Sequence, residues 1–353
     1  MRRSLLITAV LLCWMGSPVE AAAQTAAEVR LGTEVETPAT YGFDPERLGR
    51  AIIHAEGLAP LNSLLIARGD SLVVERYFRG LDAGEQTNLK SASKSILSGL
   101  VGIALEEGHL DSLDQPIGPF FPEILSDAPP QKRQITLRDL LTMRAGLEST
   151  SFGNYGAWVT SDNWVRDALT RPLVHPPGTE MMYSTGTSHL VSAILTKATG
   201  MSTKAYAQSR LFEPLGIRSP SWQRDPQGIY FGGNNMALTP RAMLKIGQLY
   251  LNDGRYRGQQ ILPEGWAHAS TRRYVLDTFR GFTYGYFWWI DTFDGVRTHF
   301  AWGYGGQYIY VVPGLDLVVV CTSSLTNRPD GIDDHNERIH RLLAEYILPA
   351  VQR

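Results

Sequence analysis

The chain has 353 residues, of which 43% are hydrophobic and 19% are charged, and its formal net charge at pH 7 is −2. This length fits one large domain or two ordinary ones, and the composition is that of a globular protein with enough apolar residues for a substantial core. Because the charges nearly balance and no basic stripe is present, nucleic acid is excluded as an expected partner.

The N-terminal segment has the pattern of an export signal. Arg2 and Arg3 precede the apolar run LLITAVLLCWMG, and the following SPVEAAAQ offers small residues for cleavage after Ala21 or Ala23. The apolar run is short for a membrane-spanning helix, which needs roughly 20 residues, and no later segment is long enough. We therefore expect residues 1–23 to be a signal peptide, and the mature protein to be periplasmic or secreted without a stable membrane span.

The chain has two cysteines, Cys13 and Cys321. Removal of the signal peptide leaves Cys321 alone, so no intramolecular disulfide is expected. Cys321 follows the apolar run LDLVVV, which predicts a buried position in a strand.

Regular elements begin after a polar arm at residues 24–40, which has no periodicity. Asp44 followed by Pro45 has the pattern of a helix cap and a first helical residue. The segment LNSLLIARGDSLVVERYF then predicts two strands joined as a hairpin. Ser91 begins a long helical pattern, SASKSILSGLVGIALEEGHL, that ends at Gly108.

The segment from about residue 110 to residue 235 differs from its flanks. Helical pieces such as TLRDLLTM and SHLVSAILTKATG are separated there by loops rich in Pro and Gly. A further helix ends at Asn252–Gly254, the strand-like segments GFTYGYFWWI, THFAWGYGGQYIYVV and DLVVVCTS follow, and NERIHRLLAEYIL predicts a final helix. We expect strands from both ends of the chain to share one sheet, closed by terminal helices, with the middle segment inserted as a mostly helical subdomain.

The segment SASK places a serine and a lysine one helical turn apart on the same face, Ser91 and Lys94. Serine is a poor nucleophile without a base, and a lysine whose pKa is lowered by burial can serve as that base. The backbone N–H of Ser91, at the helix start, points toward developing negative charge. The pair suits acyl transfer, although S-x-x-K alone is common by chance and could also be a helix cap with a solvated lysine.

From about residue 41 to the C-terminus, the sequence resembles the serine β-lactamase-like hydrolases. This superfamily includes class C β-lactamases, D-Ala-D-Ala carboxypeptidases, esterases and 6-aminohexanoate-dimer hydrolases. The resemblance rests on SASKS and on LDQPIGPFFPE, ITLRDLLTMRAGL, HPPGTEMMYSTG, LFEPLGI and GQLYLNDGRYRGQQILP in the family's order. It implies an α+β, β-lactamase/transpeptidase-like fold over residues 41–353, with a central antiparallel sheet flanked by helices and a helical subdomain inserted at about 110–235.

The family's second motif, Tyr-x-Asn, reads Tyr183-Ser184-Thr185 in this sequence. A tyrosine held near cations such as Lys94 can relay a proton to and from the leaving group. The alternative for Tyr183 is a core or rim aromatic residue. Thr185 offers a hydroxyl to the substrate in place of the carboxamide.

The family's third motif is Lys-Thr-Gly or His-x-Gly, and the matching stretch here is THFAWGYGGQ. Gly303 matches the glycine, Trp302 precedes it, and Ala301 stands where the family has a cation. The resemblance implies that these three residues contact substrate. It also implies that the backbone N–H of Tyr304 is the second oxyanion donor beside that of Ser91.

The missing cation at Ala301 predicts a preference for uncharged acyl groups, because the cation helps penicillin-recognising members to bind the substrate carboxylate. His299 would face the same side of the strand and could partly replace the charge, although a structural histidine is the alternative. Arg297 and Arg241 are further candidates.

No metal or organic cofactor is expected. The spacing of His335 and His340 in HNERIH is not that of a zinc site, and a solvated helix face is the simpler interpretation. The chain contains no G-x-S-x-G elbow, which argues against an ordinary α/β-hydrolase.

These observations predict an exported serine hydrolase that works through an acyl-enzyme on a small-molecule ester, amide or peptide-like substrate. Ser91 would attack the carbonyl, Lys94 and Tyr183 would handle its proton, and water would deacylate the enzyme. Esters or amides of uncharged acyl groups fit best, as in the esterase and aminohexanoate-oligomer branches. The alternatives are a β-lactamase or D-Ala-D-Ala carboxypeptidase, and an inactive penicillin-binding-like protein that only binds its ligand.

Overall fold

The structure is a computed structural model that describes residues 38–352 apart from residue 279 and residues 327–331. The expected signal peptide lies outside these residues, as does the expected arm up to residue 37. The two ends of the described chain meet, because Phe43 and Val351 form an isolated antiparallel bridge.

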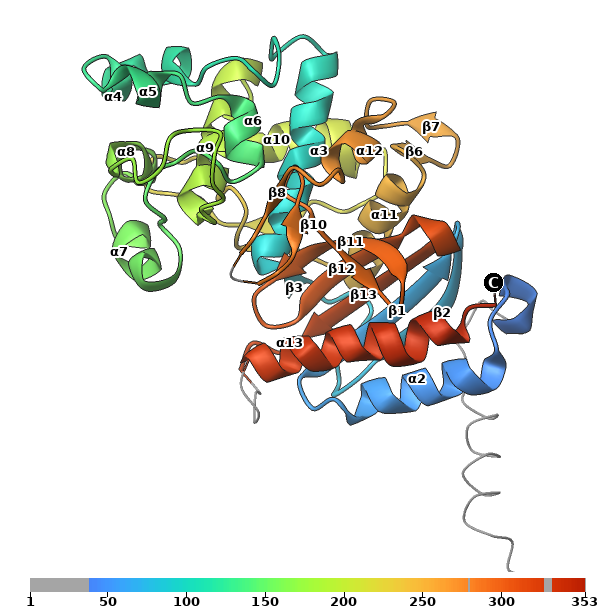
Figure 1. Ribbon diagram of the computed structural model, residues 1–353. Helices are drawn as coiled ribbons and strands as arrows, with labels where there is room; N and C mark the ends of the chain where they lie inside the picture. Colours follow the sequence, from blue (N-terminus) through green and yellow to red (C-terminus); the bar gives the residue numbers. More distant parts are fainter. Residues whose placement is uncertain (1–37, 279, 327–331, 353) are drawn as a thin grey trace, which may run out of the picture.

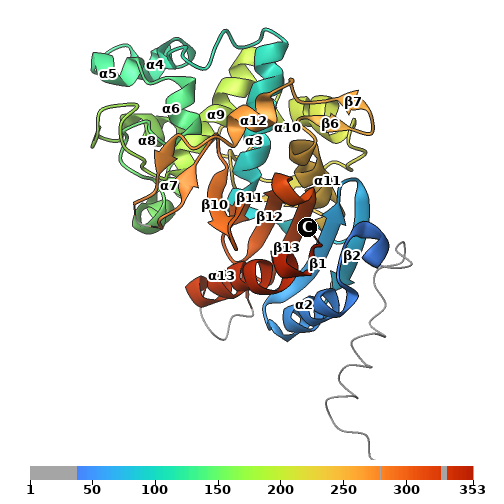
Figure 2. The same ribbon diagram turned by 45° about the vertical axis from the view of Figure 1, so that its right-hand side comes forward.

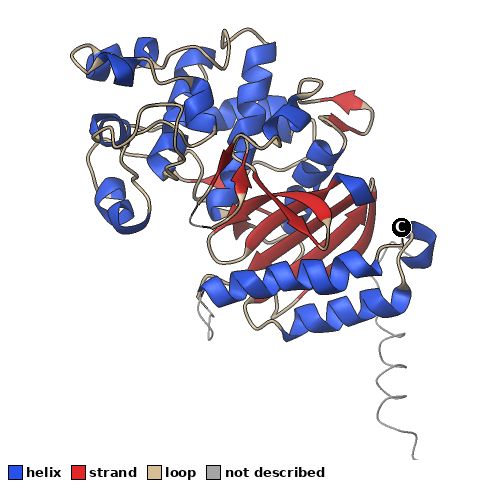
Figure 3. Ribbon diagram, viewed as in Figure 1, coloured by secondary structure: helices blue, strands red, loops and turns tan. Residues whose placement is uncertain are grey.

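An eight-stranded antiparallel sheet lies at the centre of the described chain (Figures 1 and 3). In spatial order its strands are β2 (Ser71–Tyr77), β1 (Leu61–Arg68), β13 (Leu317–Ser323), β12 (Gln307–Val312), β11 (Val296–Gly303), β10 (Trp289–Phe293), β9 (Thr283–Tyr284) and β8 (Val275–Leu276). Strand β1 pairs with β13, so strands from both ends of the sequence share the sheet as predicted. The predicted α+β fold with a central antiparallel sheet is therefore confirmed.

Helices cover both faces of this sheet (Figure 2). Helix α2 (Pro45–Gly57) lies on one face beside α13 (Ile332–Arg341), which continues into a π-helical turn at Leu342–Ile347. Helix α11 (Pro240–Leu251) packs on the opposite face against β12 and β13. Both of these strands are buried along their whole length, which explains why their sequences are mostly apolar rather than alternating.

The N-terminal elements form where the sequence predicts them. The Asp44 carboxylate caps α2 by accepting hydrogen bonds from the backbone N–H groups of Glu46 and Arg47, and Pro45 is the first helical residue. Strands β1 and β2 form the predicted hairpin. Cys321 lies buried in β13, as its apolar neighbours predict.

Most of the remaining helices gather beyond one end of the sheet (Figure 1). They are α4 (Pro122–Leu125), α5 (Pro130–Arg133), α6 (Leu137–Leu141), α7 (Tyr155–Val159), α8 (Trp164–Thr170), α9 (Thr185–Thr199), α10 (Thr203–Ala207) and α12 (Trp266–Ser270). Two small sheets accompany them, formed by β3 (Thr87–Asn88), β4 (Ser221–Trp222) and β5 (Met236–Leu238), and by β6 (Arg255–Tyr256) and β7 (Gln259–Gln260).

Helix α3 (Ser93–Glu106) connects the eight-stranded sheet to the group of helices just named, which we call the helical part. It packs against β11 of the sheet and against α9 and α12 of the helical part. Its residues from Ser93 to Ala104 are all buried, so it is a central rather than an amphipathic surface helix. The predicted start of this helix is corrected by the structure: Ser91 lies in a separate 3-10 turn, Lys90–Ala92, directly before α3.

The segment GFTYGYFWWI is not one continuous strand. It forms β9 and β10 with a tight turn between them, in which the N–H of Gly285 donates to the carbonyl of Trp288. Phe287 in this turn has a positive φ of 59°. Gly285 is needed because a β-carbon there would lie 2.1 Å from the carbonyl oxygen of Ser270.

Candidate active site

A cavity of about 420 Å³ opens where the turn before α3, the helical part and the end of β11 meet. The residues that line it are Lys90, Ser91, Ser151, Phe152, Tyr155, Tyr183, Thr185, Asn234, Arg280, Trp289, Trp302 and Tyr304. Six of these are aromatic, which is the wall expected of a pocket for an organic ligand. Three of the predicted catalytic and oxyanion residues, Ser91, Tyr183 and Tyr304, thus lie around one space.

Local backbone geometry presents Ser91 at the cavity wall. Lys90, directly before it, has a φ of 51°, a left-handed conformation that is uncommon for a residue with a side chain. The backbone N–H of Lys90 donates to the side-chain oxygen of Asn88, which supports this conformation. Ser91 itself lies in the first turn of helical structure, where backbone N–H groups have no acceptor within the helix.

Lys94 lies behind Ser91, one turn along the chain. Its Nζ is 3.0 Å from Ser91 Oγ, and the residue is only 1% exposed. Burial disfavours the ammonium ion and lowers the pKa of Lys94 to about 7. A substantial fraction of the lysine is therefore the neutral amine near neutral pH, the form that can accept the serine proton.

The other contacts of Lys94 fix the direction of its amine. Its Nζ donates to the carbonyl oxygen of Gly233 at 2.7 Å and to Thr185 Oγ1 at 3.5 Å. A neutral amine has two N–H donors and one lone pair. With the two donors directed at these acceptors, the lone pair is left to face Ser91 Oγ.

Tyr183 is positioned by the start of α9, because the next residue, Ser184, caps that helix. The centroid of the Tyr183 ring is 5.2 Å from Lys94 Nζ. Burial raises the pKa of Tyr183 to about 12, although hydrogen bonding with Ser91 and the charge of Arg280 oppose this shift. Tyr183 is accordingly a neutral phenol at physiological pH.

Thr185 is held by a residue that the sequence did not single out. The backbone N–H of Thr185 donates to Ser151 Oγ at 2.9 Å, and the two side-chain oxygens are 3.0 Å apart. Ser151 lies before the short 3-10 turn Phe152–Asn154, and no motif marks it. Both hydroxyls line the cavity, so the wall near Lys94 is polar at this point.

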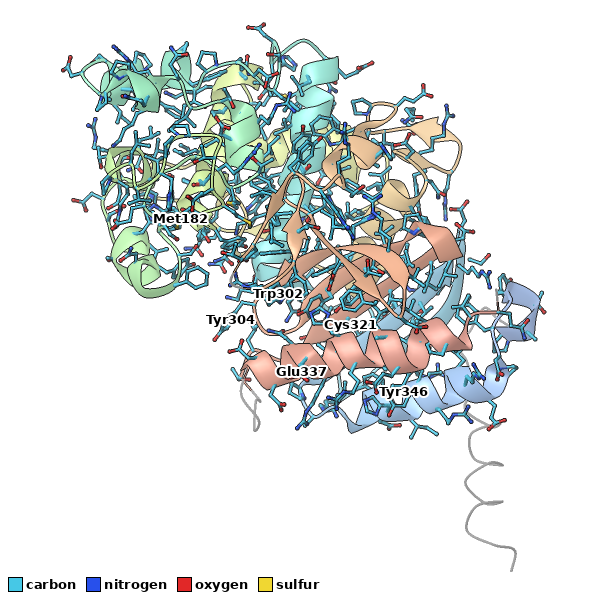
Figure 4. The ribbon with its side chains drawn as sticks, viewed as in Figure 1. Met182, Trp302, Tyr304, Cys321, Glu337 and Tyr346 are labelled. Carbon is cyan, nitrogen blue, oxygen red and sulfur yellow. The ribbon has the colours of Figure 1, made fainter. Side chains whose placement is uncertain are left out.

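The third-motif residues are divided between the cavity and the core. Trp302 lines the cavity, and Figure 4 shows it with Tyr304 at the end of the sheet nearest the helical part. Ala301 is fully buried and is not among the lining residues. Gly303 allows close packing, because a β-carbon there would lie 1.9 Å from the carbonyl oxygen of Leu89. The end of β11 therefore packs directly on the segment that carries Ser91.

None of the cations that the sequence offered in place of residue 301 lines the cavity. His299 is buried, and burial lowers its pKa to about 3, so it is neutral. Arg297 donates to the backbone carbonyl of Thr271, and Arg241 forms a two-pronged ion pair with Glu75. The contacts of these three side chains are therefore structural and lie away from the cavity.

The cavity wall instead contains Arg280, which lies between β8 and β9. Its guanidinium carbon lies 5.4–5.9 Å from the ring centroids of four aromatic residues, Phe152, Tyr183, Trp289 and Trp302. It also forms an ion pair with Asp277 at 2.8 Å. No motif or periodicity surrounds Arg280 in the sequence, so only the fold could reveal it.

Two negative findings concern the described residues alone. No group of three or more His, Cys, Asp or Glu side chains in that part of the chain is arranged to hold a metal ion. Within the same residues, each helix is too short or too polar to cross a bilayer.

The antiparallel sheet, the helical part and the serine–lysine–tyrosine cluster together define a hydrolase of the serine β-lactamase fold. The chain belongs to the Beta-lactamase family, whose model matches residues 53–345. The resemblance drawn from SASKS and its flanking segments is thereby confirmed.

Individual relatives are distant. The chain is 23% identical to the 6-aminohexanoate-dimer hydrolase of Paenarthrobacter ureafaciens over 343 residues, which covers 84% of each chain. A Bacillus anthracis structure provisionally named as a 6-aminohexanoate-dimer hydrolase matches with a TM-score of 0.70 and 22% identity, over 82% of this chain and 79% of that one. Unliganded simvastatin synthase from Aspergillus terreus matches with a TM-score of 0.66 and 17% identity, over 87% and 99%. At these identities, the structural matches establish the fold alone.

Proposed function

We propose that this protein is a serine hydrolase that cleaves carboxyl esters or amides of uncharged acyl groups through an acyl-enzyme. The observation that carries the proposal is the buried Lys94 amine, 3.0 Å from Ser91 Oγ at the wall of an aromatic cavity. A buried amine with a lowered pKa is suited to activate a serine hydroxyl.

In the first half-reaction, Ser91 Oγ attacks the substrate carbonyl carbon while its proton passes to Lys94 Nζ. The carbonyl oxygen becomes an oxyanion, for which the backbone N–H groups of Ser91 and Tyr304 are the proposed donors. Loss of one such donor typically lowers the rate by about 10²–10³-fold. The packing of Gly303 on Leu89 therefore contributes to catalysis, because it sets the distance between the two donor N–H groups.

The leaving group needs a proton when the tetrahedral intermediate collapses. The raised pKa of Tyr183 favours a relay rather than a phenolate base: the phenol donates its proton to the leaving oxygen or nitrogen and recovers one from the Lys94 ammonium. Water then attacks the acyl-enzyme, gives a proton to Lys94 and releases the acid, and Ser91 recovers its proton.

Two features support an uncharged acyl group. The cavity wall is mainly aromatic, and the position of the family's third-motif cation is occupied by Ala301, which is buried. The charge of Arg280 is balanced by Asp277 and covered by rings. The Paenarthrobacter ureafaciens relative is named a 6-aminohexanoate-dimer hydrolase, which fits an amide substrate because an amide bond joins two aminohexanoate units.

Arg280 also favours a second candidate, a β-lactamase or D-Ala-D-Ala carboxypeptidase. A guanidinium in the cavity wall can bind a carboxylate, and among the described residues the lining contains no acidic side chain. The two candidate functions differ in whether a carboxylate on the substrate improves its binding and turnover.

The sequence of residues 1–23 supports the further proposal that the protein is exported. The mass of the mature chain recovered from the native host tests it, since cleavage after Ala21 or Ala23 gives two defined values.

The test of the proposed function is p-nitrophenol release from short-chain p-nitrophenyl esters by the mature protein and by Ser91→Ala. Turnover that disappears in the variant, together with labelling of wild-type Ser91 by a fluorophosphonate, supports the proposal. Turnover that persists in Ser91→Ala excludes Ser91 as nucleophile. The absence of both turnover and labelling would instead favour the binding-protein alternative.

A further inference from the structure

A buried histidine–aspartate pair lies outside the cavity and has no part in the mechanism above. His189 Nε2 on α9 is 2.9 Å from Asp225 Oδ2, and both side chains are 0% exposed. No sequence motif connects the two residues. A buried pair of this kind calls for an explanation, because burial of a charged carboxylate is costly unless its hydrogen bonds are satisfied.

The pair is connected to the backbone beside Lys94. The N–H of Gly232 donates to His189 Nδ1 at 3.1 Å, and the carbonyl of the next residue, Gly233, accepts the hydrogen bond from Lys94 Nζ. Because Nδ1 faces a donor, it must be the unprotonated ring nitrogen, so Nε2 carries the hydrogen and donates to Asp225. Hydrogen bonds thus run from Asp225 through His189 to the N–H of Gly232, and the residue that follows carries the carbonyl that contacts the proposed base.

The geometry of Asp225 requires a carboxylate. Its Oδ1 accepts from the N–H groups of Gln227 and Ile229 at 2.9 and 2.8 Å, while Oδ2 faces the Nε2–H of His189. Only an acceptor-only group can satisfy donors on both oxygens. An amide would place its NH₂ group against either the His189 ring or the 227–229 backbone.

The backbone of Gly232 and Gly233 is closely packed and has little space in which to shift. A β-carbon at Gly232 would lie 2.4 Å from the carbonyl oxygen of Ser188, and one at Gly233 would lie 2.3 Å from Lys94 Cγ. Gly233 also has a φ of 81°, which favours glycine. Ser188 Oγ donates to the Gly232 carbonyl at 2.8 Å, so α9 holds both polar groups of that residue.

We propose that His189 and Asp225 are positioning residues that hold the Gly233 carbonyl against Lys94, and so direct the lone pair of the Lys94 amine toward Ser91. This inference rests on the proposed function, because it assigns the support of its general base. Neither side chain lines the cavity, so the pair acts on the chemical step rather than on substrate binding.

The variants follow from the contacts. His189→Phe keeps an aromatic ring among Trp158, Trp164 and Phe231 but removes the acceptor for Gly232. His189→Asn can restore that acceptor, because its side-chain oxygen takes the place of Nδ1. Ser192→Ala is the matched control, since Ser192 Oγ on the same helix donates to the carbonyl of Tyr230 and contacts Thr203 Oγ1 rather than Lys94.

We expect His189→Phe and Asp225→Asn to lower kcat by up to roughly 10²-fold with little change in KM, the loss typical of a misplaced catalytic group. The acid limb of the kcat/KM profile should move to lower pH, because a carbonyl acceptor stabilises the ammonium form of Lys94 more than the amine. His189→Asn should recover most of kcat. Ser192→Ala should leave kcat and the profile unchanged, even with a similar loss of melting temperature.

The experiment measures pH profiles, melting temperatures and the rate of fluorophosphonate labelling at Ser91 for all of these proteins. A labelled wild type together with a His189→Phe variant of unchanged kcat and profile would overturn this inference alone. The same holds if Ser192→Ala loses as much activity as His189→Phe. An unlabelled, inactive wild type would overturn the proposed function and this inference with it.

Discussion

At the scale of single residues, the decisive feature is the protonation state of Lys94. Burial lowers its pKa to about 7, and only the neutral amine can accept the Ser91 proton. We expect kcat/KM to rise as the pH increases through about 7 and to level off above it, because the acidic side of the profile reports the ammonium form. A profile from pH 5 to pH 9 with a slowly hydrolysed ester measures this, and a flat profile would contradict the assignment.

The variant Lys94→Arg tests the same point without a change of charge at low pH. Arginine stays protonated in proteins, so it cannot act as the base. We expect activity to fall to the level of Ser91→Ala at every pH, whereas measurable activity with a pH midpoint near 7 would place the titrating group elsewhere.

Tyr183 gives a second prediction at the residue scale, which depends on the leaving group. Its phenol is neutral because burial raises its pKa to about 12, so it is suited to protonating the leaving atom. We expect Tyr183→Phe to lower amide hydrolysis by about 10²–10⁴-fold, the usual contribution of a general acid. Hydrolysis of p-nitrophenyl esters should fall much less, since p-nitrophenolate leaves without a proton. Equal losses on matched ester and amide substrates would argue against the relay.

At the scale of elements, the site depends on how closely β11 approaches the turn before α3. The β-carbon of Gly303→Ala would lie 1.9 Å from the carbonyl oxygen of Leu89, so the strand and the nucleophile segment must move apart. We expect a loss of stability of about 1–3 kcal/mol, typical of overpacking, and a larger proportional loss of kcat because the two proposed oxyanion donors separate. Gly153→Ala is the control, because a β-carbon at Gly153 meets no atom within 4 Å. Chemical denaturation and ester kinetics on both variants provide the comparison.

The connection between β8 and β9 brings Arg280 to the cavity and allows the two substrate classes to be separated. If the enzyme acts on uncharged acyl groups, Arg280→Gln should change kcat/KM similarly for neutral substrates and for otherwise matched substrates that carry a carboxylate. If it is a β-lactamase or carboxypeptidase, the variant should lose at least tenfold more on the charged substrates. A panel of paired neutral and carboxylate-bearing esters and amides decides between them.

How much of the site the sequence could predict depends on how many elements each contact joins. Ser91 and Lys94 are three residues apart on consecutive turns, so local pattern suggested the pair, and the resemblance to the family's motifs supported it and added Tyr183. Arg280, Ser151 and the Gly233 carbonyl come from loops whose positions are set only by packing of distant segments.

The third motif shows a different limit. Ala301 and Trp302 are adjacent on β11, and alternation along a strand sends their side chains to opposite faces. The resemblance implied that both contact substrate; in the structure Trp302 lines the cavity, and Ala301 is fully buried. The fold itself was more accessible, because it follows from strand and helix patterns spread over the whole chain. The exception is the interruption between β9 and β10, which depends on the turn around Phe287.

At the scale of the whole molecule, the buried His299 and the partly buried His340 couple stability to pH. Burial lowers the pKa of His299 to about 3 and that of His340 to about 4, from an ordinary value near 6.5. Below pH 6.5 the unfolded chain takes up protons at these positions and the folded chain does not, so the free energy of unfolding falls as the pH falls. The loss should be about 1.4 kcal/mol per pH unit for each histidine until the folded state also protonates, and neither contributes above pH 6.5.

The window between pH 6.5 and pH 5 isolates this effect, because most carboxylates stay charged there. His299 packs beside the Trp288 ring, and among the described residues its Nε2 has no hydrogen-bond partner, so His299→Phe removes a titrating group without breaking a hydrogen bond at that atom. Urea unfolding at several pH values should show that the variant loses stability over this window with a shallower slope than the wild type. Parallel curves would mean that His299 is protonated in the folded protein, which would require a charge or water beside it. If the slopes differ as expected, His299 stays unprotonated in the folded sheet, and its burial in β11 is then one cause of the protein's loss of stability in acid.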